Sequence, residues 1–494
     1  MSNARPSNPT ALSSRFLLYR ILGYMLLMLA ALKIVAVVVA VIYDEKIFWV
    51  FLASAFLTAI LANLLIFRGR HHHPQLKSRQ LFALTTLSWL SICVFAAIPI
   101  WLIVPNCTWV DAWFETVSAI TTTGSTVFAG LDHMPKALLF WRAVLNWVGG
   151  IGIIVMAIAI LPMLKIGGMK LFKTESSDIS EKILPKSSTL SSSIGMVYLL
   201  LSVITMFSYY AAGMSGFDAI THGMSTVATG GFANYDASFG QYRDNPLIFW
   251  LGSLFMIAAA LPFVLYVAMV KTDRWAIWRD PQVKAFLTIV LSCSLALAAY
   301  QHWQQERPWF DALTHSLFNV VSIITTCGYA SEDYTLWGPF AVMVFFYLTF
   351  CGACSGSTSG GLKIFRIQLA ALLLMKQFKL LIHPKAVISQ KYGGRTVDDQ
   401  LLGTVLAFCF IYFATIAALA LALSFYQLDL VTAVTGAATA VANVGPGLGS
   451  IIGPAGNFSS LPDGAKLWLT IGMLMGRLEI LTMLIFFTPA YWRY

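Results

Sequence analysis

SIITTCG, residues 322–328, lies between two long apolar segments and recurs in altered form three times elsewhere in the chain. The other copies are SAITTTG at 118–124, STVATGG at 225–231 and TAVANVG at 439–445. Each copy ends in a glycine that follows a small hydroxyl residue by six positions and a Thr or Asn by two. Four similar loops in one chain can close a ring, and a ring of backbone carbonyls can replace the water around a monovalent cation. The recurrence therefore predicts a selective ion pathway.

The composition places these loops in a membrane. The chain has 494 residues, of which 58% are hydrophobic and 11% charged, whereas about a quarter of the residues of a soluble domain are charged. A spanning helix needs about 20 residues, so the chain has room for many crossings of a lipid bilayer and for no large soluble domain. The first apolar stretch, 21–42, is longer than the core of a signal peptide and lacks a clean cleavage site, so we expect it to remain as an anchor.

The net charge of +10 is interpreted as a topology signal and not as a sign of nucleic-acid binding. Acidic residues gather near the glycine motifs, whereas basic residues gather in four other segments: 68–79, 165–186, 271–284 and 363–395. The positive-inside rule then places the basic segments and both termini in the cytoplasm and the glycine motifs toward the outside. The seven cysteines form neither a metal-ligand spacing nor a disulfide framework, and we expect no organic cofactor.

Ten apolar runs have spanning length: 21–42, 48–67, 81–104, 137–161, 194–213, 246–270, 284–301, 338–375, 401–425 and 466–488. After the first two, the order is helix, short segment with the glycine motif, helix, four times over. This order predicts an all-α polytopic membrane protein with four helix–pore loop–helix repeats in a pseudo-fourfold arrangement plus two extra N-terminal transmembrane helices. The predicted parts are the N-terminal pair (1–75), repeat 1 (76–165), repeat 2 (166–272), repeat 3 with a broken second helix (273–395) and repeat 4 (396–494).

The segments before the glycines are interpreted as re-entrant pore helices. Stretches such as 111–120 and 218–227 are too short to cross a membrane and carry Asp near their start, where a helix favours negative charge. A single motif would be an ordinary helix-ending turn, but fourfold recurrence favours a filter. The residues just before the glycines share no side-chain chemistry, so we expect their carbonyls to coordinate the ion. The candidate potassium-binding residues are Thr122, Thr123, Gly124, Thr229, Gly230, Gly231, Thr326, Cys327, Gly328, Asn443, Val444 and Gly445.

Two further features are candidate gating elements. The run 338–375 is too long for one crossing and is interrupted by GACSGSTSGG at 352–361, in which each glycine costs a helix about 1 kcal/mol. One alternative is a broken helix packed on its neighbours; we favour a mobile loop across the pathway on the cytoplasmic side of the filter. The candidate gate glycines are Gly352, Gly356, Gly360 and Gly361.

Arg477 is the second gating candidate, because it lies midway along the last predicted helix, where a charge is costly and usually marks function. Glu479 is two positions away and does not face it on a helix. One alternative is a structural pair with another helix; the functional hypothesis is a fixed positive charge that tethers the glycine-rich loop or slows cation passage. In the fourth span, Asn146, Gly149 and Gly150 would let another helix approach closely.

Five motifs, taken together, resemble a known family. FWRAVLNWVGGIGI (140–153), STVATGGFANYD (225–236), NVVSIITTCGYASEDY (319–334), GACSGSTSGGLKIFR (352–366) and ANVGPGLG (442–449) are similar to the TrkH/TrkG-type potassium uptake proteins of the Trk/Ktr/HKT superfamily. The resemblance runs through nearly the whole chain. It implies potassium uptake across the bacterial inner membrane by a homodimer, with the four loops as filter and the glycine-rich loop and Arg477 as gate. It also implies a cytosolic nucleotide-binding regulatory subunit of TrkA type.

The resemblance also bears on the ion. Sodium-preferring members of the superfamily carry serine at the first filter glycine, so Gly124 favours potassium, while Cys327 is a departure from the threonine of many relatives. No enzyme activity is expected. Two alternatives remain: a proton-coupled potassium symporter, for which only Arg477 and Glu479 lie deep, and an intramembrane serine protease using Ser355 or Ser359, for which no histidine base is evident.

Overall fold

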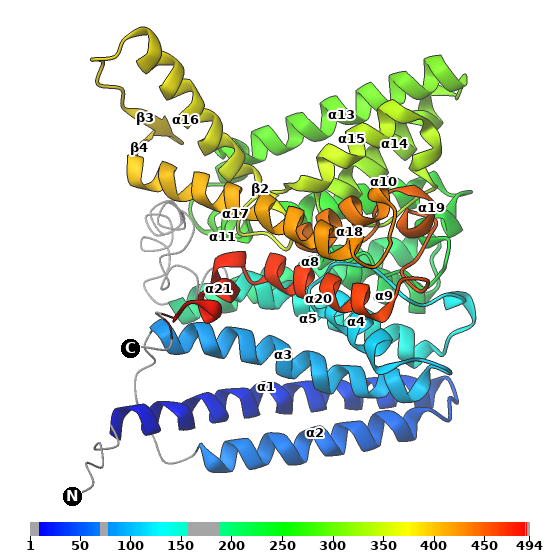
Figure 1. Ribbon diagram of the computed structural model, residues 1–494. Coiled ribbons are helices and arrows are strands. Elements are labelled where there is room, and N and C mark those ends of the chain that lie inside the picture. Colours follow the sequence, from blue (N-terminus) through cyan, green and yellow to red (C-terminus); the bar gives the residue numbers. More distant parts are fainter. Residues whose placement is uncertain (1–8, 70–77, 157–186, 490, 492–494) are drawn as a thin grey trace, which may run out of the picture. The chain divides into compact units, whose positions relative to one another are not determined.

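The computed structural model describes residues 9–69, 78–156, 187–489 and 491, and these residues are mostly helical (Figure 1). The predicted all-α class is confirmed. The α-helices are α1 (Pro9–Ile42), α2 (Phe48–Arg68), α3 (Ser78–Ile103), α4 (Trp109–Ile120), α5 (Lys136–Val155), α8 (Ser187–Ala211), α9 (Gly216–Val227), α10 (Pro246–Ala260), α11 (Phe263–Lys271), α12 (Ala276–Arg279), α13 (Pro281–Gln305), α14 (Trp309–Ile324), α15 (Pro339–Phe350), α16 (Ile364–Ile382), α17 (Asp399–Ser424), α18 (Leu430–Ala442), α19 (Gly449–Ile452), α20 (Asp463–Arg477) and α21 (Ile480–Leu484).

Short elements join these helices. Four 3₁₀ turns are described: η1 (Leu131–His133), η3 (Ser238–Tyr242), η4 (Tyr334–Trp337) and η5 (Ile485–Phe487). Strand β1 (Cys351–Gly352) pairs in parallel with β2 (Leu362–Lys363), and β3 (Gln390–Tyr392) pairs antiparallel with β4 (Arg395–Val397). The first pair brings together the two ends of the glycine-rich segment 352–361.

The chain divides into two compact units. The smaller comprises Met1–Thr116, Met134–Trp141 and Thr482–Tyr494, and the larger comprises Val117–His133 and Arg142–Leu481. The larger unit holds all four glycine motifs. The five-part division based on the repeats stays a prediction.

In the smaller unit, α1, α2 and α3 run alongside one another (Figure 1). A fully buried lysine ties them together: Lys33 Nζ donates to Ser54 Oγ at 2.6 Å, to Thr58 Oγ1 at 2.9 Å and to the carbonyl of Phe95 at 2.8 Å. An ammonium group has three donors, and each of them has an acceptor here. This cluster fixes the two extra N-terminal helices against the third.

Most of the predicted spans have a matching helix. Among the described residues, seven helices are long and apolar enough to cross a membrane, or eight if α10 and α11 count as one bent span. The uninterrupted helix predicted at 246–270 is wrong, because the chain bends by 85° between α10 and α11. Pro262 lies at this break, where it cannot donate the backbone hydrogen bond that a continuing helix needs.

The last predicted helix, 466–488, is also wrong as a single element. Helix α20 ends at Arg477, and Glu479 has a φ of +58°, a left-handed conformation that stops a right-handed helix. Arg477 therefore lies at the end of a helix and not midway along one. The interruption predicted within 338–375 is present, because α15 ends at Phe350 and α16 begins at Ile364.

Four short helices precede the glycine motifs, where the sequence predicted pore helices. They are α4, α9, α14 and α18, with 12, 12, 16 and 13 residues, fewer than the about 20 that a crossing requires. Acids mark their starts as expected. Asp111, Asp218 and Asp311 lie in first turns, and Asp429 caps α18 by accepting from the amide of Thr432.

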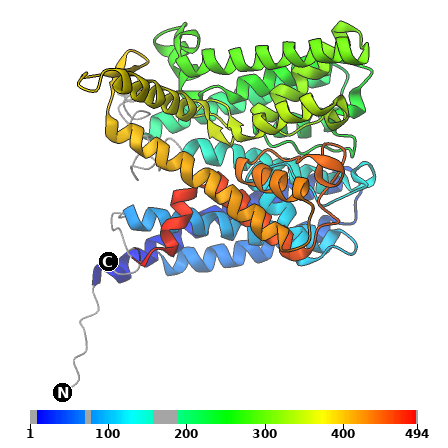
Figure 2. The same ribbon diagram turned by 45° about the horizontal axis from the view of Figure 1, so that its top comes forward.

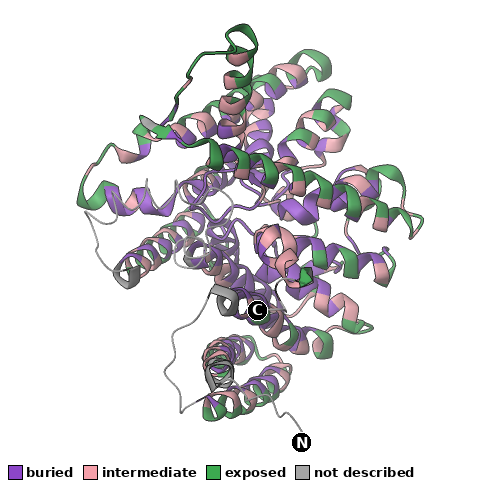
Figure 3. Ribbon diagram, turned by 60° about the vertical axis from the view of Figure 1, so that its left-hand side comes forward, coloured by how far each residue is buried: buried purple, intermediate pink, exposed green. Residues whose placement is uncertain are grey.

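Buried residues gather around the loops that follow these short helices. In Figure 3 the central region of the larger unit is mostly purple, and green residues lie on the outward faces of the helices around it. Helix α16 and the β3–β4 hairpin project from one edge of this unit (Figure 2). The polar motif residues are therefore enclosed by protein, as polar backbone at membrane depth requires.

Candidate ion-binding site and gate

All four short helices end in the same hydrogen-bonded turn. The amide just before each glycine donates to the carbonyl of the small hydroxyl residue that opens the motif, at 2.9, 2.9, 2.9 and 3.1 Å in chain order. The amide of the residue two before each glycine donates to the carbonyl three residues earlier in the chain, at 3.0 to 3.3 Å. These two bonds make a Schellman motif. The six-residue spacing from the hydroxyl residue to the glycine is thus the spacing of a helix C-terminus.

The residue two before each glycine is left-handed in every copy. Its φ is +53° at Thr122, +49° at Thr229, +58° at Thr326 and +56° at Asn443. Glycine or asparagine is usual in this conformation, and a β-branched residue there is an outlier. Each threonine costs on the order of 1–3 kcal/mol of strain. Three strained threonines in matching positions indicate that their side chains have a use.

The glycines themselves close a cycle of contacts. A Cβ added to Gly124 would lie 2.6 Å from the carbonyl oxygen of Gly230, the residue just before the second motif's glycine. The same relation links the second motif to the third, the third to the fourth and the fourth back to the first. An added Cβ would lie 1.9 Å from Cys327 O at Gly231, 2.1 Å from Val444 O at Gly328 and 2.7 Å from Thr123 O at Gly445. The structure therefore brings the twelve candidate filter residues together.

The fourth motif, which departs most in sequence, is cross-linked to the first. Asn443 Nδ2 donates to Thr123 Oγ1 and to the carbonyl of Met473, both at 2.9 Å. On the other side of the glycines, Ser125 Oγ donates to the carbonyl of Gly445 at 2.8 Å. Asparagine thus supplies two donors, whereas the hydroxyl of a threonine at this position would supply one.

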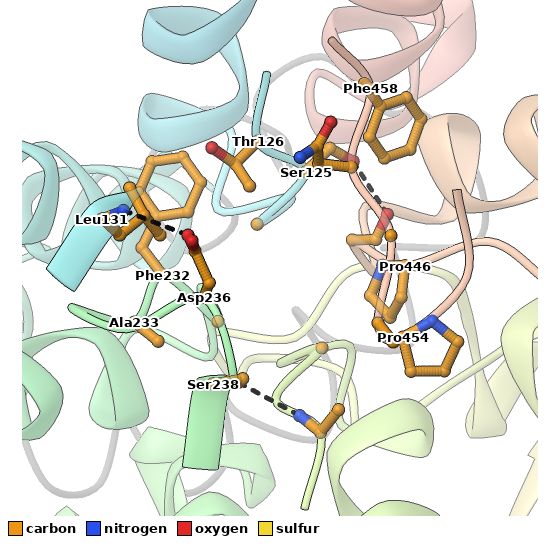
Figure 4. A pocket seen from close by; sticks show the side chains of 18 of the residues that line it. Ser125, Thr126, Leu131, Phe232, Ala233, Asp236, Ser238, Pro446, Pro454 and Phe458 are labelled. Atoms are coloured by element: carbon orange, nitrogen blue, oxygen red, sulfur yellow. Dashed lines mark hydrogen bonds between the residues drawn. The ribbon is translucent and has the colours of Figure 1, made fainter. Parts of the chain in front are cut away.

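A cavity of about 210 Å³ lies beside the ring, and all four motif glycines line it. Figure 4 shows segments from each motif around it. Asp236 accepts from the amides of Gly130 at 2.7 Å and Leu131 at 3.1 Å. Its carboxylate therefore adds negative charge to the lining of this cavity.

Arg142 also lines this cavity, and sequence reasoning did not single it out. The buried guanidinium donates to the carbonyl of Ala233 at 3.1 Å and to Thr126 Oγ1 at 3.3 Å, and it lies 4.1 Å from the centre of the Phe232 ring. It thus bridges the segments that leave the first and second motifs. A cation inside an apolar helix was the available signal.

Helix α5 packs closely on the ends of the short helices. Asn146 Nδ2 donates to Ser225 Oγ at 2.9 Å. A Cβ on Gly149 would lie 2.0 Å from the carbonyl oxygen of Ile120, and one on Gly150 would lie 2.8 Å from Ala228 Cα. This is the close approach that these small residues predicted.

The glycine-rich segment 352–361 lies directly against the motifs. The amide of Gly360 donates to Thr326 Oγ1 at 2.6 Å, and Thr229 Oγ1 lies 3.2 Å from Thr358 Oγ1. A Cβ on Gly360 would lie 2.4 Å from the carbonyl oxygen of Ala442, which precedes Asn443. The segment therefore touches the second, third and fourth motifs at their left-handed residues.

The break between α10 and α11 holds the same segment. The carbonyl of Ala260 accepts from the amide of Cys354 at 3.3 Å, and the carbonyl of Ala259 accepts from Thr358 Oγ1 at 3.1 Å. In return, the amide of Phe263 donates to the carbonyl of Gly356 at 3.0 Å. The carbonyls freed where α10 ends thus find their partners in the glycine-rich segment.

Arg477 reaches the same segment from the end of α20. Its side chain is 2% exposed; Nη1 donates to the carbonyl of Thr358 at 3.0 Å, and Nη2 donates to the carbonyl of Gly149 at 3.4 Å. Glu479 pairs with Arg366 at 2.7 Å. Arg477 is thus bonded to the loop, as the tether hypothesis required, and Glu479 has a different partner.

Ser359 has a lysine neighbour that the sequence did not reveal. Lys363 Nζ donates to Ser359 Oγ at 3.0 Å and also to the carbonyl of Ser359, and Ser357 Oγ lies 2.9 Å from Ser359 Oγ. Serine–lysine pairs occur in hydrolases. Here the serine is 1% exposed, and the lysine clamps its backbone as well, which fits a structural contact within the loop better than a nucleophile.

Comparisons with known proteins identify the family and the fold of the chain. The family model TrkH, described as cation transport protein, matches residues 48–494. The Trk system potassium uptake protein TrkI of Halomonas elongata is 53% identical over 418 residues, 85% of each chain. The Escherichia coli protein TrkH is 35% identical over 482 residues, 96% of this chain and 98% of that one. The crystal structure of the potassium transporter TrkH from Vibrio parahaemolyticus superposes with a TM-score of 0.89 at 34% identity, covering 97% of this chain and 100% of that chain. This multi-pass membrane chain therefore belongs to the TrkH family of cation transport proteins.

Proposed function

We propose that this chain carries potassium ions across the membrane through the ring formed by its four glycine motifs. The observation that supports this best is the closed cycle in which each glycine abuts the carbonyl before the next. Such a ring offers oxygen ligands without side-chain obstruction, as a selectivity filter requires. The C-terminal ends of the four short helices, which carry partial negative charge, all lead into it. The membrane potential supplies about 2.3 kcal/mol per charge per 100 mV.

The filter in this proposal has three layers of four equivalent residues each, in a pseudo-fourfold arrangement. The proposed potassium-binding residues are Thr122, Thr123, Gly124, Thr229, Gly230, Gly231, Thr326, Cys327, Gly328, Asn443, Val444 and Gly445. Segment 352–361 and Arg477 act as the gate. The segment donates to Thr326 on the side of the ring away from the cavity, and Arg477 donates to the segment at Thr358. These contacts support the role, because a loop held there blocks the way out of the ring.

The proposed setting is the bacterial inner membrane, with both termini cytoplasmic, a homodimer and a cytosolic nucleotide-binding subunit of TrkA type. The support is that similar proteins are named as parts of a Trk system for potassium uptake. The basic segment 165–186, expected to face such a subunit, lies outside the described residues.

Flux through purified protein in liposomes tests the filter. At a clamped potassium potential, the wild type should pass potassium in preference to sodium. Gly231→Ser should lose that preference, because its side chain would collide with the carbonyl of Cys327. Gly403→Ser is the matched control, since nothing lies within 4 Å of a Cβ at Gly403. Unchanged ion preference in folded Gly231→Ser would refute the assignment. Repeating the assay across a pH gradient distinguishes proton coupling from passive flow.

A further inference from the structure

The segments that leave the second, third and fourth motifs are each bonded back to the short helix that precedes the motif. In each case the amide three residues after the glycine donates to a side chain on that helix, and we call this contact the exit latch. The acceptors are His222 Nε2 for Asn234 at 3.4 Å, Asn319 Oδ1 for Ser331 at 3.1 Å and Thr435 Oγ1 for Leu448 at 3.0 Å. Each acceptor side chain also donates to the carbonyl one turn earlier in its own helix, at 3.0, 3.0 and 2.7 Å. The latch therefore fixes where the chain leaves the ring.

The exits of the second and third motifs are built alike. His222 and Asn319 both lie nine residues before the glycine of their motif, and in each helix a side chain one turn earlier makes a second tie to the same exit residue. The two ties are Asp218 Oδ1, which accepts from Asn234 Nδ2 at 2.7 Å, and His315 Nδ1, which lies 2.8 Å from Ser331 Oγ. The two latches differ in their chemistry, because an imidazole holds the second exit and an amide holds the third.

The contacts of His222 fix its protonation state. A carbonyl can only accept, so Nδ1, which lies 3.0 Å from the carbonyl of Asp218, carries a hydrogen. A backbone amide can only donate, so Nε2, which accepts from Asn234, carries none. The imidazole is therefore neutral while the latch is closed. An imidazolium has two donors and no acceptor, so a proton on Nε2 and the bond from Asn234 exclude each other.

The groups around His222, which is 0% exposed, adjoin the cavity beside the ring. Asp218, on the same helix, supplies a negative charge that acts on the imidazole, and Tyr235 donates to this carboxylate at 2.9 Å and lines the cavity. The ionisable groups that face the imidazole from other segments are phenols: Tyr235, Tyr242 and Tyr329, with ring centres 6.3, 5.9 and 6.2 Å away. Phenols stay neutral near pH 7. The charge beside the imidazole is therefore negative, and it compensates the charge of an imidazolium.

We propose that His222 is a positioning residue for the second motif and that its protonation opens the exit latch, which makes ion selectivity depend on pH. The proposal rests on the proposed potassium pathway and adds a regulation of it. Asn234 follows Gly231 by three residues, so release of its amide loosens the carbonyls of the second motif. Histidine changes its charge between about pH 5 and about pH 8, whereas the amide of Asn319 and the hydroxyl of Thr435 do not. Of these three latches, the second is therefore the one that titrates.

Ion selectivity measured against pH tests the proposal. Purified protein is reconstituted in liposomes with the same pH on both sides, so that no proton gradient contributes, and potassium flux and sodium flux are compared at about pH 8 and at about pH 5. We expect the preference of the wild type for potassium to fall about fivefold at the lower pH, the factor that one hydrogen bond corresponds to. His222→Ala, which has no latch at either pH, should show the low preference throughout.

His222→Asn is the decisive variant, because Asn319 shows that an amide makes both contacts at this position of the helix. It should prefer potassium more strongly than His222→Ala does, and equally at both pH values. His222→Gln, whose amide reaches further, takes its place if His222→Asn does not fold. His315→Asn is the matched control, because it removes the buried histidine of α14, where the latch is an amide, and the fall at low pH should remain.

Three results would overturn the role of His222: a preference for potassium in the wild type that does not change with pH, a fall in folded His222→Asn as large as in the wild type, or a fall that His315→Asn abolishes. The same fluxes separate this failure from that of the proposed function. Selective potassium flux without the expected pH dependence would refute only the titrating latch. Absence of selective potassium flux at both pH values would refute the potassium pathway itself.

Discussion

Arg477 Nη1 donates to the backbone carbonyl of Thr358 at 3.0 Å, and Arg477 is the last residue of α20. The guanidinium therefore lies at the negative end of a helix dipole, which stabilises a buried cation. The same contact fastens the glycine-rich segment to the end of α20. One side chain thus supplies both a charge beneath the ring and a tether for the loop below it.

Replacing this arginine should open the pathway. Arg477→Ala removes a hydrogen bond from a charged donor, which stabilises by about 1.5–3 kcal/mol, so potassium flux in liposomes should rise roughly 10- to 100-fold if this bond limits opening. Arg477→Lys is the comparison, because it keeps the charge but has no planar fork to reach Thr358 and Gly149 together. Flux in folded Arg477→Ala no higher than in the wild type would count against the tether.

The neighbouring ion pair has a different role, so its loss should show in stability. Arg366, 2% exposed, pairs with Glu479 at 2.7 Å and lies 3.6 Å from the centre of the Phe408 ring. Removing one partner of a buried ion pair lowers the free energy of unfolding by about 3–5 kcal/mol. Glu479→Gln should therefore lower the melting temperature of the purified protein by several degrees. The double variant Arg366→Met with Glu479→Leu should recover much of the loss, and no recovery would show that the charges themselves are required.

Glu332, which follows the third glycine motif, makes the stability of the protein depend on pH. Burial alone would raise its pKa, but hydrogen bonds from Arg307, the charge of His315 and a bond from Trp337 hold the pKa below its usual value of 4.5. A carboxyl group whose pKa is lower in the folded than in the unfolded chain stabilises the fold at pH values above its unfolded pKa. This stabilisation is lost as the pH falls through its folded pKa. The melting temperature should thus be flat above about pH 5 and fall below pH 4.5.

Glu332→Gln should reduce the decrease in melting temperature below pH 4.5, because the side chain no longer titrates. Asp398→Asn is the comparison. This exposed carboxylate caps α17 by accepting from the amide of Gln400, so most of the decrease in melting temperature at acid pH should survive in this variant. If the melting temperature of Glu332→Gln falls at acid pH as much as that of the wild type, other carboxylates cause the decrease.

Much of the site could be predicted from local sequence. The spacing from a hydroxyl residue to glycine is the spacing of a Schellman turn, which four helices share, and segment 352–361 carries too many glycines to continue a helix. Both features are local in the chain. They therefore revealed the twelve motif residues and the loop before any partner was known.

The breaks at Pro262 and Glu479, and the contacts of the loop with the α10–α11 bend, could not be predicted. Leu261 and Pro262 lie within an apolar run whose hydropathy does not change at the break, and the bend is held by contacts between Phe263 and Gly356 that are far apart in sequence. Arg477 seemed mid-helix for the same reason, because the apolar run continues past Glu479. Hydropathy reports burial and not the direction of the backbone.

Asn443 provides a last prediction, on the least regular member of the ring. Its amide donates to Thr123 Oγ1 and to the carbonyl of Met473, so it holds the fourth motif against the first and against α20. Asn443→Gly keeps the left-handed backbone without strain but removes both bonds. We expect it to reduce the preference for potassium over sodium by roughly tenfold, since two hydrogen bonds of about 1 kcal/mol each fix the position of one quarter of the ring. Asn443→Ala adds strain at a φ of +56° and should also lower the melting temperature. If Asn443→Gly retains full selectivity in the liposome flux assay, the cross-link does not set the geometry of the filter, and asparagine serves only as a tolerated left-handed residue.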